Sequence, residues 1–405
     1  MTEPQPSASR VPASRVPASR DGASRGYRPD LFLLDPHVTH LNHGSFGAVP
    51  IPVLAAQREA SEAIERSPER FYRADLAPAL DAVREQVAAF FHTDAEGLAL
   101  VQNATEAVQV VLEAVDLRPG SEIVYTDHAY WWVQTAIARA CEQYGAVARC
   151  VPMPQVGEAG GFSGALVAAI HGALTTRTAL VVLDQITSAS ALHLPVDAVI
   201  AALPADVPVL VDAAHAPGLI DRPVPEGATF WLGNLHKWAF SARTAAALVV
   251  APNWRARVRP LVASAGAAEG YPRSFTYLGT QDPTAYLALP AALGFPREHL
   301  SMSFGELRER NEALLNDGLE LLANYLGIAP ARPNGLPLRA IEMGREADDA
   351  TAAAMTQALR EDGVEVAMTS VGGRLHARVS VQAYVELADF ERLAQALKAL
   401  LASTR

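Results

Sequence analysis

Two residues near the middle of the chain, Asp212 and Lys237, form a pairing that could do covalent chemistry. Asp212 ends the apolar run 208–211, and Lys237 follows the next apolar run, 229–232. A lysine amine can form a Schiff base with an aldehyde, and a carboxylate can keep a pyridine nitrogen protonated. Pyridoxal 5'-phosphate (PLP) needs both groups. The spacing therefore predicts Lys237 as the catalytic lysine and Asp212 as the partner of the ring nitrogen.

Short apolar segments that alternate with helical patterns must position these two residues. The segments are rich in β-branched residues on both faces, which is typical of a parallel sheet covered by helices. The predicted strands are 98–101, 122–125, 146–151, 179–183, 207–211, 229–232 and 245–250. Asn103, Asp127, Asp184 and Asp212 follow strand ends, so we expect polar side chains along one edge of the sheet, where ligands bind.

Several separated blocks resemble the class V aminotransferase family of PLP enzymes, and within it the isopenicillin N epimerase-like group. They include Asn-His-Gly-Ser-Phe-Gly, Asp-Ala-Ala-His-Ala-Pro-Gly and His-Lys-Trp. The blocks lie at 41–47, 103–107, 211–218, 236–238, 279–282 and 378–380, in the order of the family. The resemblance covers roughly residues 31–400 and implies PLP as the cofactor.

The resemblance implies the α/β architecture of PLP fold type I, in a homodimer with shared active sites. A large domain, 30–295, would hold a mostly parallel sheet with helices on both faces. Its first part, 30–60, would line the cleft and pack on a smaller C-terminal α/β domain, 296–405. Residues 1–29 contain the repeat Val-Pro-Ala-Ser-Arg, and their composition predicts a disordered tail.

The phosphate of PLP is expected at the start of a helix. Asn103, Ala104 and Thr105 follow a strand, and N–H groups with a hydroxyl at a helix start can bind an anion. The alternative is an ordinary helix cap. The resemblance adds Asn234 and His236 to this phosphate site.

The resemblance also implies residues around the ring of the cofactor. Tyr130 would stack on it, with His128 as the alternative. His215 would bind the ring hydroxyl or hold Asp212, and Thr187 would also contact the cofactor.

The resemblance also assigns the substrate side of the cleft. Arg378 would clamp the substrate carboxylate, because a planar guanidinium binds a carboxylate through two hydrogen bonds. Asn42, His43 and Ser45 would line the substrate pocket. Thr280 would reach across the dimer interface to the phosphate of the partner subunit.

The turn after Lys237 departs from the family pattern. Ala242 and Thr244 stand where the family has Pro and Gly, and Ala191 stands at another position where the family often has Gly. These changes lie near the cofactor and predict a reshaped pocket.

The resemblance implies an enzyme that acts at Cα of a modified α-amino acid in a biosynthetic pathway. Two reactions are expected: epimerisation, or β-elimination from a cysteine S-conjugate by a C–S lyase. A class V aminotransferase, or a PLP-dependent decarboxylase or oxidative deaminase, is the alternative. A cofactor-binding protein without turnover is a remote alternative.

The composition and net charge of the chain limit the kinds of partner that it can bind. The 405 residues are 50% hydrophobic and carry a net charge of −11, which argues against binding nucleic acid or an anionic membrane. No apolar run approaches the roughly 18–20 residues of a membrane span. We expect a cytoplasmic enzyme without a metal site, whose ligand is an amino acid or an amino-acid conjugate.

Overall fold

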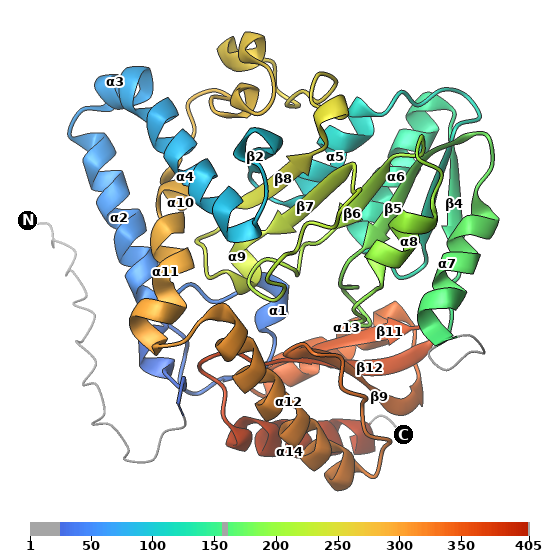
Figure 1. The fold of residues 1–405 in the computed structure, drawn as a ribbon. Coiled ribbons are helices and arrows are strands. Elements are labelled where there is room, and N and C mark those ends of the chain that lie inside the picture. Colours follow the sequence, from blue (N-terminus) through green and yellow to red (C-terminus); the bar gives the residue numbers. More distant parts are fainter. Residues whose placement is uncertain (1–24, 156–160, 404–405) are drawn as a thin grey trace, which may run out of the picture.

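The large domain is built on a seven-stranded sheet in the order β2-β8-β7-β6-β5-β3-β4. The computed structural model describes residues 25–155 and 161–403 (Figure 1). Only β8 runs antiparallel to its neighbours, so the sheet is mostly parallel, as predicted. The strands are β2 (Leu98–Val101), β3 (Glu122–Thr126), β4 (Val147–Val151), β5 (Thr178–Asp184), β6 (Val209–Asp212), β7 (Phe230–Asn234) and β8 (Ala246–Val250).

Helices cover both faces of this sheet because alternate strand residues are apolar on both sides. Along β5, Val181 and Leu183 pack on one face, and Leu180 and Val182 pack on the other. The first face is covered by α4 (Leu76–Phe91), α7 (Gly161–Ala173) and α8 (Val196–Ala202). The second face is covered by α5 (Ala104–Ala114) and α6 (Trp131–Tyr144). The two buried layers fix the strand ends on which the polar residues lie.

The small domain contains an antiparallel sheet in the order β11-β12-β9. Its strands are β9 (Leu338–Glu346), β11 (Ala367–Val371) and β12 (Arg374–Ser380). Its helices are α12 (Phe304–Leu326), α13 (Asp349–Glu361) and α14 (Leu387–Ser403). Figure 1 shows this sheet below the carboxyl edge of the large one, with α12 and α14 on its outer side.

The two domains are joined near the N-terminus by a short segment that pairs with the small domain. Strand β1 (Thr39–His40) runs parallel to β10 (Val364–Glu365). The chain then forms α1 (His43–Phe46), which packs on α9 (Leu235–Trp238), before it enters α2 (Ile51–Glu65). This segment places residues 42–47 between the domains.

The predicted domain boundary at 295/296 falls inside a helix, α11 (Leu289–Leu300). Its residues Ala292, Phe295 and Leu300 belong to the apolar core of the small domain. The helix therefore connects the domains as a rigid element and not as a linker, because its apolar face is shared with that core.

The predicted disordered tail, residues 1–29, overlaps the folded protein at residues 25–29. Its repeat lies in residues 1–24, outside the described residues. Arg28 donates its backbone N–H to the Ala383 carbonyl at 2.8 Å. Arg25 donates to the Ser301 carbonyl at 3.1 Å and to Glu306 at 3.3 Å. Residues 25–29 thus belong to the folded protein, since contacts with the small domain hold them.

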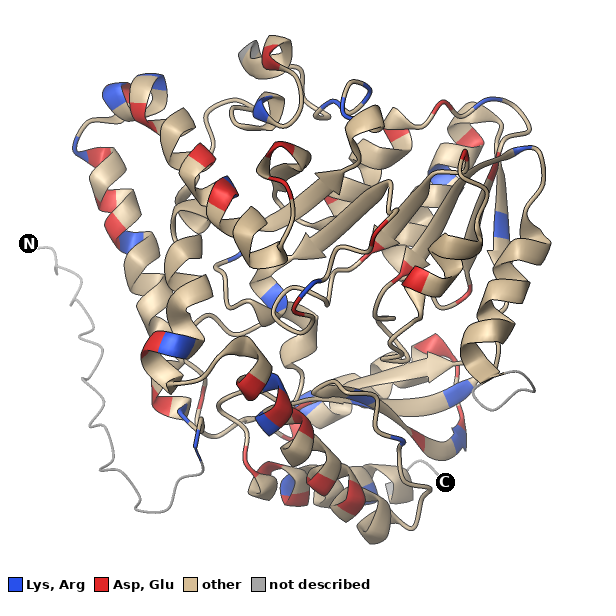
Figure 2. Cartoon of the chain, viewed as in Figure 1, with Lys and Arg blue, Asp and Glu red and all other residues tan. Residues whose placement is uncertain are grey.

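Charged residues gather on the outer helices and loops, whereas the central strands of the large sheet are mainly uncharged (Figure 2). Within residues 25–155 and 161–403, none of the helices combines the length and the apolar character of a membrane span. The same residues contain no cluster of acidic, cysteine or histidine side chains that could hold a metal ion.

Candidate active site

A cavity of about 180 Å³ lies at the carboxyl ends of β5, β6 and β7. It collects most of the residues that the sequence predicted, from positions that are far apart in the chain. Those that line it are Ser45, Asn103, Ala104, Thr105, Tyr130, Asp212, His215, Asn234, His236 and Lys237. The sheet edge expected from the strand pattern is therefore the place where these side chains meet.

Lys237 lies in α9, which begins directly after β7. Its Nζ is 3.1 Å from Nε2 of His215, and the Trp238 indole N–H donates to Nδ1 of the same ring at 3.2 Å. Burial, with the charge of Arg378 added, lowers the pKa of Lys237 to about 7. A large share of the amine is therefore unprotonated at neutral pH, as a nucleophile must be.

Two glycines let the backbone approach α9 closely. Gly47 has φ of 70°, and a Cβ there would lie 2.2 Å from the His236 carbonyl oxygen. Gly218 has φ of 86°, and its Cβ would lie 2.6 Å from the Trp238 carbonyl oxygen. Larger residues at either position would push the segment that carries Lys237 out of place.

His43 holds this segment from behind and does not line the cavity. Its Nε2 lies 2.9 Å from the Lys237 carbonyl oxygen, and its Nδ1 lies 2.9 Å from the Tyr384 hydroxyl. Burial lowers the pKa of His43 to about 3, so the ring is neutral. The predicted substrate contact of His43 is corrected to a supporting position, because both ring nitrogens are occupied.

Asp212 ends β6 and is buried. Its Oδ1 accepts a hydrogen bond from the Ala214 backbone N–H at 3.0 Å, and burial raises its pKa. His215 makes no hydrogen bond with Asp212 but contacts Lys237 and Trp238. Of the two alternatives for His215, holding Asp212 is therefore not observed in the structure.

The start of α5 faces the cavity. Asn103 caps the helix by accepting from the Glu106 backbone N–H at 2.9 Å, and Asn234 accepts from the Ala104 N–H at 2.9 Å. Thr105 lines the cavity beside them. His236 lies opposite, with its Nδ1 3.1 Å from the Ala245 carbonyl oxygen. Asn103 therefore serves as the helix cap, and the Ala104 N–H is taken by Asn234, so Thr105 is the residue at this helix start that is left to bind an anion.

Tyr130, not His128, lines the cavity. His128 is turned to Ser190, whose hydroxyl lies 2.8 Å from its Nδ1. Trp132 also lines the cavity and is 46% exposed, and it stacks on Trp131, which is 57% exposed. The cavity therefore opens beside a pair of exposed aromatic rings.

Arg378, from β12 of the small domain, does not line the cavity itself but contacts Ser45 and Ser188, which do. Its guanidinium donates to the Ser188 carbonyl at 2.9 Å, to the Asn42 side-chain oxygen at 3.0 Å and to the Ser45 hydroxyl at 2.5 Å. Its Nε is buried and has no hydrogen-bond partner among the residues that the structure describes. Burial lowers the pKa of Arg378 to about 10, and the side chain stays cationic at neutral pH.

Besides His43 and Arg378, three predicted residues stand outside the cavity. Asn42 orients Arg378 from behind. Thr187 is fully buried, and its hydroxyl lies 2.7 Å from that of Ser190 and accepts from the Leu192 N–H. Its neighbour Ser188 lines the cavity. Thr280 is exposed and contacts Tyr277.

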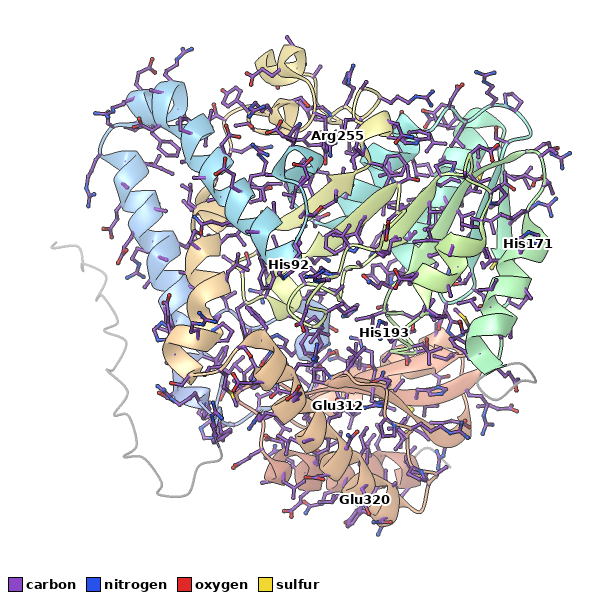
Figure 3. All side chains as sticks on the ribbon, viewed as in Figure 1. His92, His171, His193, Arg255, Glu312 and Glu320 are labelled. Atoms are coloured by element: carbon purple, nitrogen blue, oxygen red, sulfur yellow. The ribbon has the colours of Figure 1, made fainter. Side chains whose placement is uncertain are left out.

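The loop after β5 explains why Ser188 and not Thr187 faces the cavity. Figure 3 shows His193, from this loop, between the large sheet and the small domain. The loop is tied to the small domain, since Asn334 donates to the Ala191 carbonyl at 2.7 Å. Ala191 has φ of 53°, in the left-handed region, which is a physical reason for the glycine that the family often has there.

A second cavity of about 380 Å³ lies on the other side of α1. Asn42, His43 and Arg243 line it, and Phe46 borders both cavities. Arg243 donates to the Gly47 carbonyl at 2.5 Å. The altered turn after Lys237 thus contacts the N-terminal loop and does not line the cavity around Lys237.

Sequence reasoning gave no role to Asp184, Ser188, Phe46 or Trp132, which also line the first cavity. Asp184 had a signal, since it is an acid at a strand end. Phe46 and Trp132 had none beyond their neighbours, because apolar side chains usually pack in the core.

The side chains around the first cavity fit PLP. The start of α5 with Thr105 suits a phosphate, Lys237 suits an aldehyde, and the buried Asp212 suits a pyridine nitrogen. Asp184 also offers a buried oxygen, Oδ2, that has no partner among the described residues.

Comparison with known proteins agrees with this geometry. The family model described as Aminotransferase class-V matches residues 49–238. An isopenicillin N epimerase from Amycolatopsis lactamdurans is 28% identical, over 91% of this chain and 96% of its own. An L-cysteine desulfhydrase from Arabidopsis thaliana is 27% identical, over 90% and 88% of the two chains. The fold resembles that of the cystine C–S lyase C-DES, with a TM-score of 0.75 and 18% identity over 89% of this chain and 97% of that one.

Proposed function

Because the chain belongs to the class V aminotransferase family and uses PLP as its cofactor, we propose that it is a C–S lyase. Its substrate would be cysteine or a cysteine S-conjugate, and the reaction would break the bond between Cβ and sulfur. Relatives named as an L-cysteine desulfhydrase and a cystine C–S lyase support this choice of substrate class.

The observation that carries the proposal is the amine of Lys237, held at a pKa of about 7 beside His215. β-Elimination needs a base that removes the proton from Cα and an acid that can pass a proton to the departing sulfur. An amine with a pKa near the working pH does both efficiently. The bound PLP supplies the electron withdrawal that acidifies the Cα–H bond.

Arg378 would fix the substrate by its carboxylate. In the structure the guanidinium is held by Ser188 and Ser45, which both border the cavity. The terminal nitrogens of Arg378 donate to Ser188, Asn42 and Ser45, so a carboxylate would bind through two parallel hydrogen bonds by displacing the hydroxyls of Ser188 and Ser45. The amino acid is then oriented with Cα toward Lys237.

The products of the reaction distinguish the candidate functions. The holoenzyme is incubated in D₂O with cysteine, cystine and S-alkyl cysteines, alongside amino acids that lack a β-sulfur. A C–S lyase releases pyruvate, ammonia and a thiol or persulfide. Inverted chirality with deuterium at Cα and no pyruvate would instead establish an epimerase. A 2-oxo acid that keeps its β-substituent, with pyridoxamine phosphate, would establish an aminotransferase.

Epimerisation is the second candidate, and Tyr130 favours it. Tyr130 lines the cavity with Lys237, and burial raises the pKa of its phenol. A protonated phenol could return a proton to Cα after Lys237 has removed one. Tyr130→Phe should then abolish inversion but leave exchange of the Cα proton with solvent, whereas a lyase should keep elimination in this variant.

We also propose that the protein is a homodimer in which Thr280 reaches the cofactor of the partner subunit. The exposure of Thr280, together with Leu261 and Val262, which are 48% and 52% exposed, supports a surface that another subunit covers. Light scattering would give the oligomeric state. Mixing Lys237→Ala with Thr280→Asp chains should restore activity, because each mixed dimer then contains one intact site. A dimer without restored activity would place Thr280 outside the shared site.

A further inference from the structure

Asp184 and Asp212 end neighbouring parallel strands and are partners in the register of β5 and β6. Neighbouring strands lie about 4.8 Å apart, and register partners point to the same face. Both carboxyl groups line the cavity that contains Lys237, and their side chains are only 3% and 4% exposed. Two acidic groups therefore share one corner from which water is excluded.

The two carboxyl groups have different partners. Asp212 accepts from the Ala214 N–H, and the positive charge of Lys237 favours its ionised form. The Tyr130 backbone N–H favours the ionised form of Asp184, but Oδ2 of Asp184 is buried and has no partner in the described part of the chain. A buried carboxylate with an unpartnered oxygen is unfavourable, and a second carboxylate beside it adds repulsion.

We propose that Asp184 is a positioning residue that keeps a proton, so that Asp184 and Asp212 together carry one negative charge. Asp184 then presents an O–H group beside Asp212, and only Asp212 is charged toward the pyridine nitrogen. Burial and the charge of Asp212 both raise the pKa of Asp184 well above its usual range, in agreement with this assignment.

The proton on Asp184 also matters for Lys237. A second full negative charge in this corner would favour the protonated amine, since an opposite charge stabilises an ammonium group. With Asp184 neutral, the pair contributes the charge of a single acid. The other titratable or charged side chains around this corner are Tyr130, His215, His236, Lys237 and Arg378.

Infrared spectroscopy of the holoenzyme at neutral pH tests the proposal. A protonated carboxyl group has its own C=O stretch, which labelling of aspartate with ¹³C at the carboxyl carbon shifts. We expect this band in the unaltered protein and in Asp127→Asn, which changes an exposed strand-end acid that does not line the cavity. The band should be absent from Asp184→Asn. No labelled band, or a band that survives in Asp184→Asn, would overturn the proposal.

The absorption of the PLP–lysine chromophore gives a second readout. Asn is neutral, as protonated Asp is, so the pH midpoint of the chromophore in Asp184→Asn should match that of the unaltered protein. A midpoint that moves by about one pH unit or more would mean that Asp184 is charged, and would refute the shared proton. If Asp184→Asn does not fold, Asp184→Thr takes its place in the infrared test, because it also removes the carboxyl group to which the band is assigned.

Discussion

The amine of Lys237 lies 3.1 Å from Nε2 of His215, and the direction of this hydrogen bond is fixed by a third group. The indole N–H of Trp238 can only donate, so Nδ1 of His215 accepts and Nε2 carries the hydrogen of the neutral ring. Nε2 therefore donates to the amine, and only an unprotonated amine can accept. Burial lowers the pKa of His215 well below its usual value, which keeps the ring neutral.

This arrangement predicts how PLP uptake depends on pH. The rate of imine formation by the apoprotein should rise as pH rises through about 7, because the unprotonated amine of Lys237 is the nucleophile. In Trp238→Phe, His215 is free to turn its unprotonated nitrogen to Lys237, which favours the ammonium form. The midpoint should therefore move to higher pH, as measured by stopped-flow absorbance.

Trp254→Phe is the matched control, since Trp254 packs on Phe230 and lines no part of the cavity. It should keep the midpoint of the unaltered protein. An unchanged midpoint in Trp238→Phe would show that the tautomer of His215 does not set the state of Lys237.

Reduction with borohydride should attach the cofactor to Lys237. The sequence contains two lysines, Lys237 and Lys398, so peptide mapping has two possible outcomes. Lys398 is exposed and lies over the ring of Tyr325, with Nζ 4.7 Å from the ring centroid. We expect Lys237→Ala to bind PLP without a covalent bond and to lack turnover, while Lys398→Ala keeps both properties. Reduced cofactor on Lys398 would contradict the assignment.

Binding of the phosphate should take up a proton at His236. Nδ1 of His236 faces the Ala245 carbonyl, which only accepts, so Nε2 of the neutral ring has no hydrogen to donate. Burial lowers the pKa of His236 to about 4 in the free protein, and a nearby phosphate dianion should raise it. The affinity for pyridoxine 5'-phosphate should therefore fall as pH rises. Calorimetry in buffers of different ionisation enthalpy measures the proton uptake.

His236→Gln should remove the proton uptake, because an amide donates without a charge. Thr105→Val is the companion variant, and it should weaken binding by roughly 1.5–3 kcal/mol without changing the uptake, since it removes one hydrogen bond to a charged group. Equal proton uptake in His236→Gln and the unaltered protein would place the proton elsewhere.

Arg378→Lys should lower kcat/KM by about 2–4 kcal/mol, because the charge is kept but the two parallel hydrogen bonds to a carboxylate are lost. PLP content should not change. Arg374→Lys, on the same strand and paired with Glu342 on the surface, should have little effect. Loss of PLP or of thermal stability in Arg378→Lys, with KM unchanged, would show that Arg378 has a structural role, in which it connects Ser188 to Asn42.

Deletion of residues 1–24 should leave Tm and PLP content unchanged, because their composition offers no apolar surface to bury. Deletion of residues 1–28 should lower Tm, since it removes the hydrogen bond from Arg28 to the Ala383 carbonyl and the packing of Gly26 on Met302. Thermal unfolding of both shortened chains measures the difference. An equal Tm would mean that residues 25–28 contribute nothing to stability.

The sequence by itself determined the sheet and the order of its strands along the chain, and it predicted the two residues that we assign to PLP. This was possible because strands and helices have local periodicities, and because Asp212 and Lys237 each follow an apolar strand at a short distance. The start of α5 was equally local, since Asn103 caps a helix that begins one residue later.

Only the tertiary structure decided which side chains share the cavity, because that depends on register and on contacts across domains. Asp184 joins Asp212 through the register of β5 and β6, and Arg378 meets Ser45 across 333 residues of sequence. Thr187 and Ser188 are neighbours in one loop, and only Ser188 lines the cavity. His43 was assigned to the substrate by its motif, but its two ring nitrogens are taken up by Tyr384 and the backbone of Lys237.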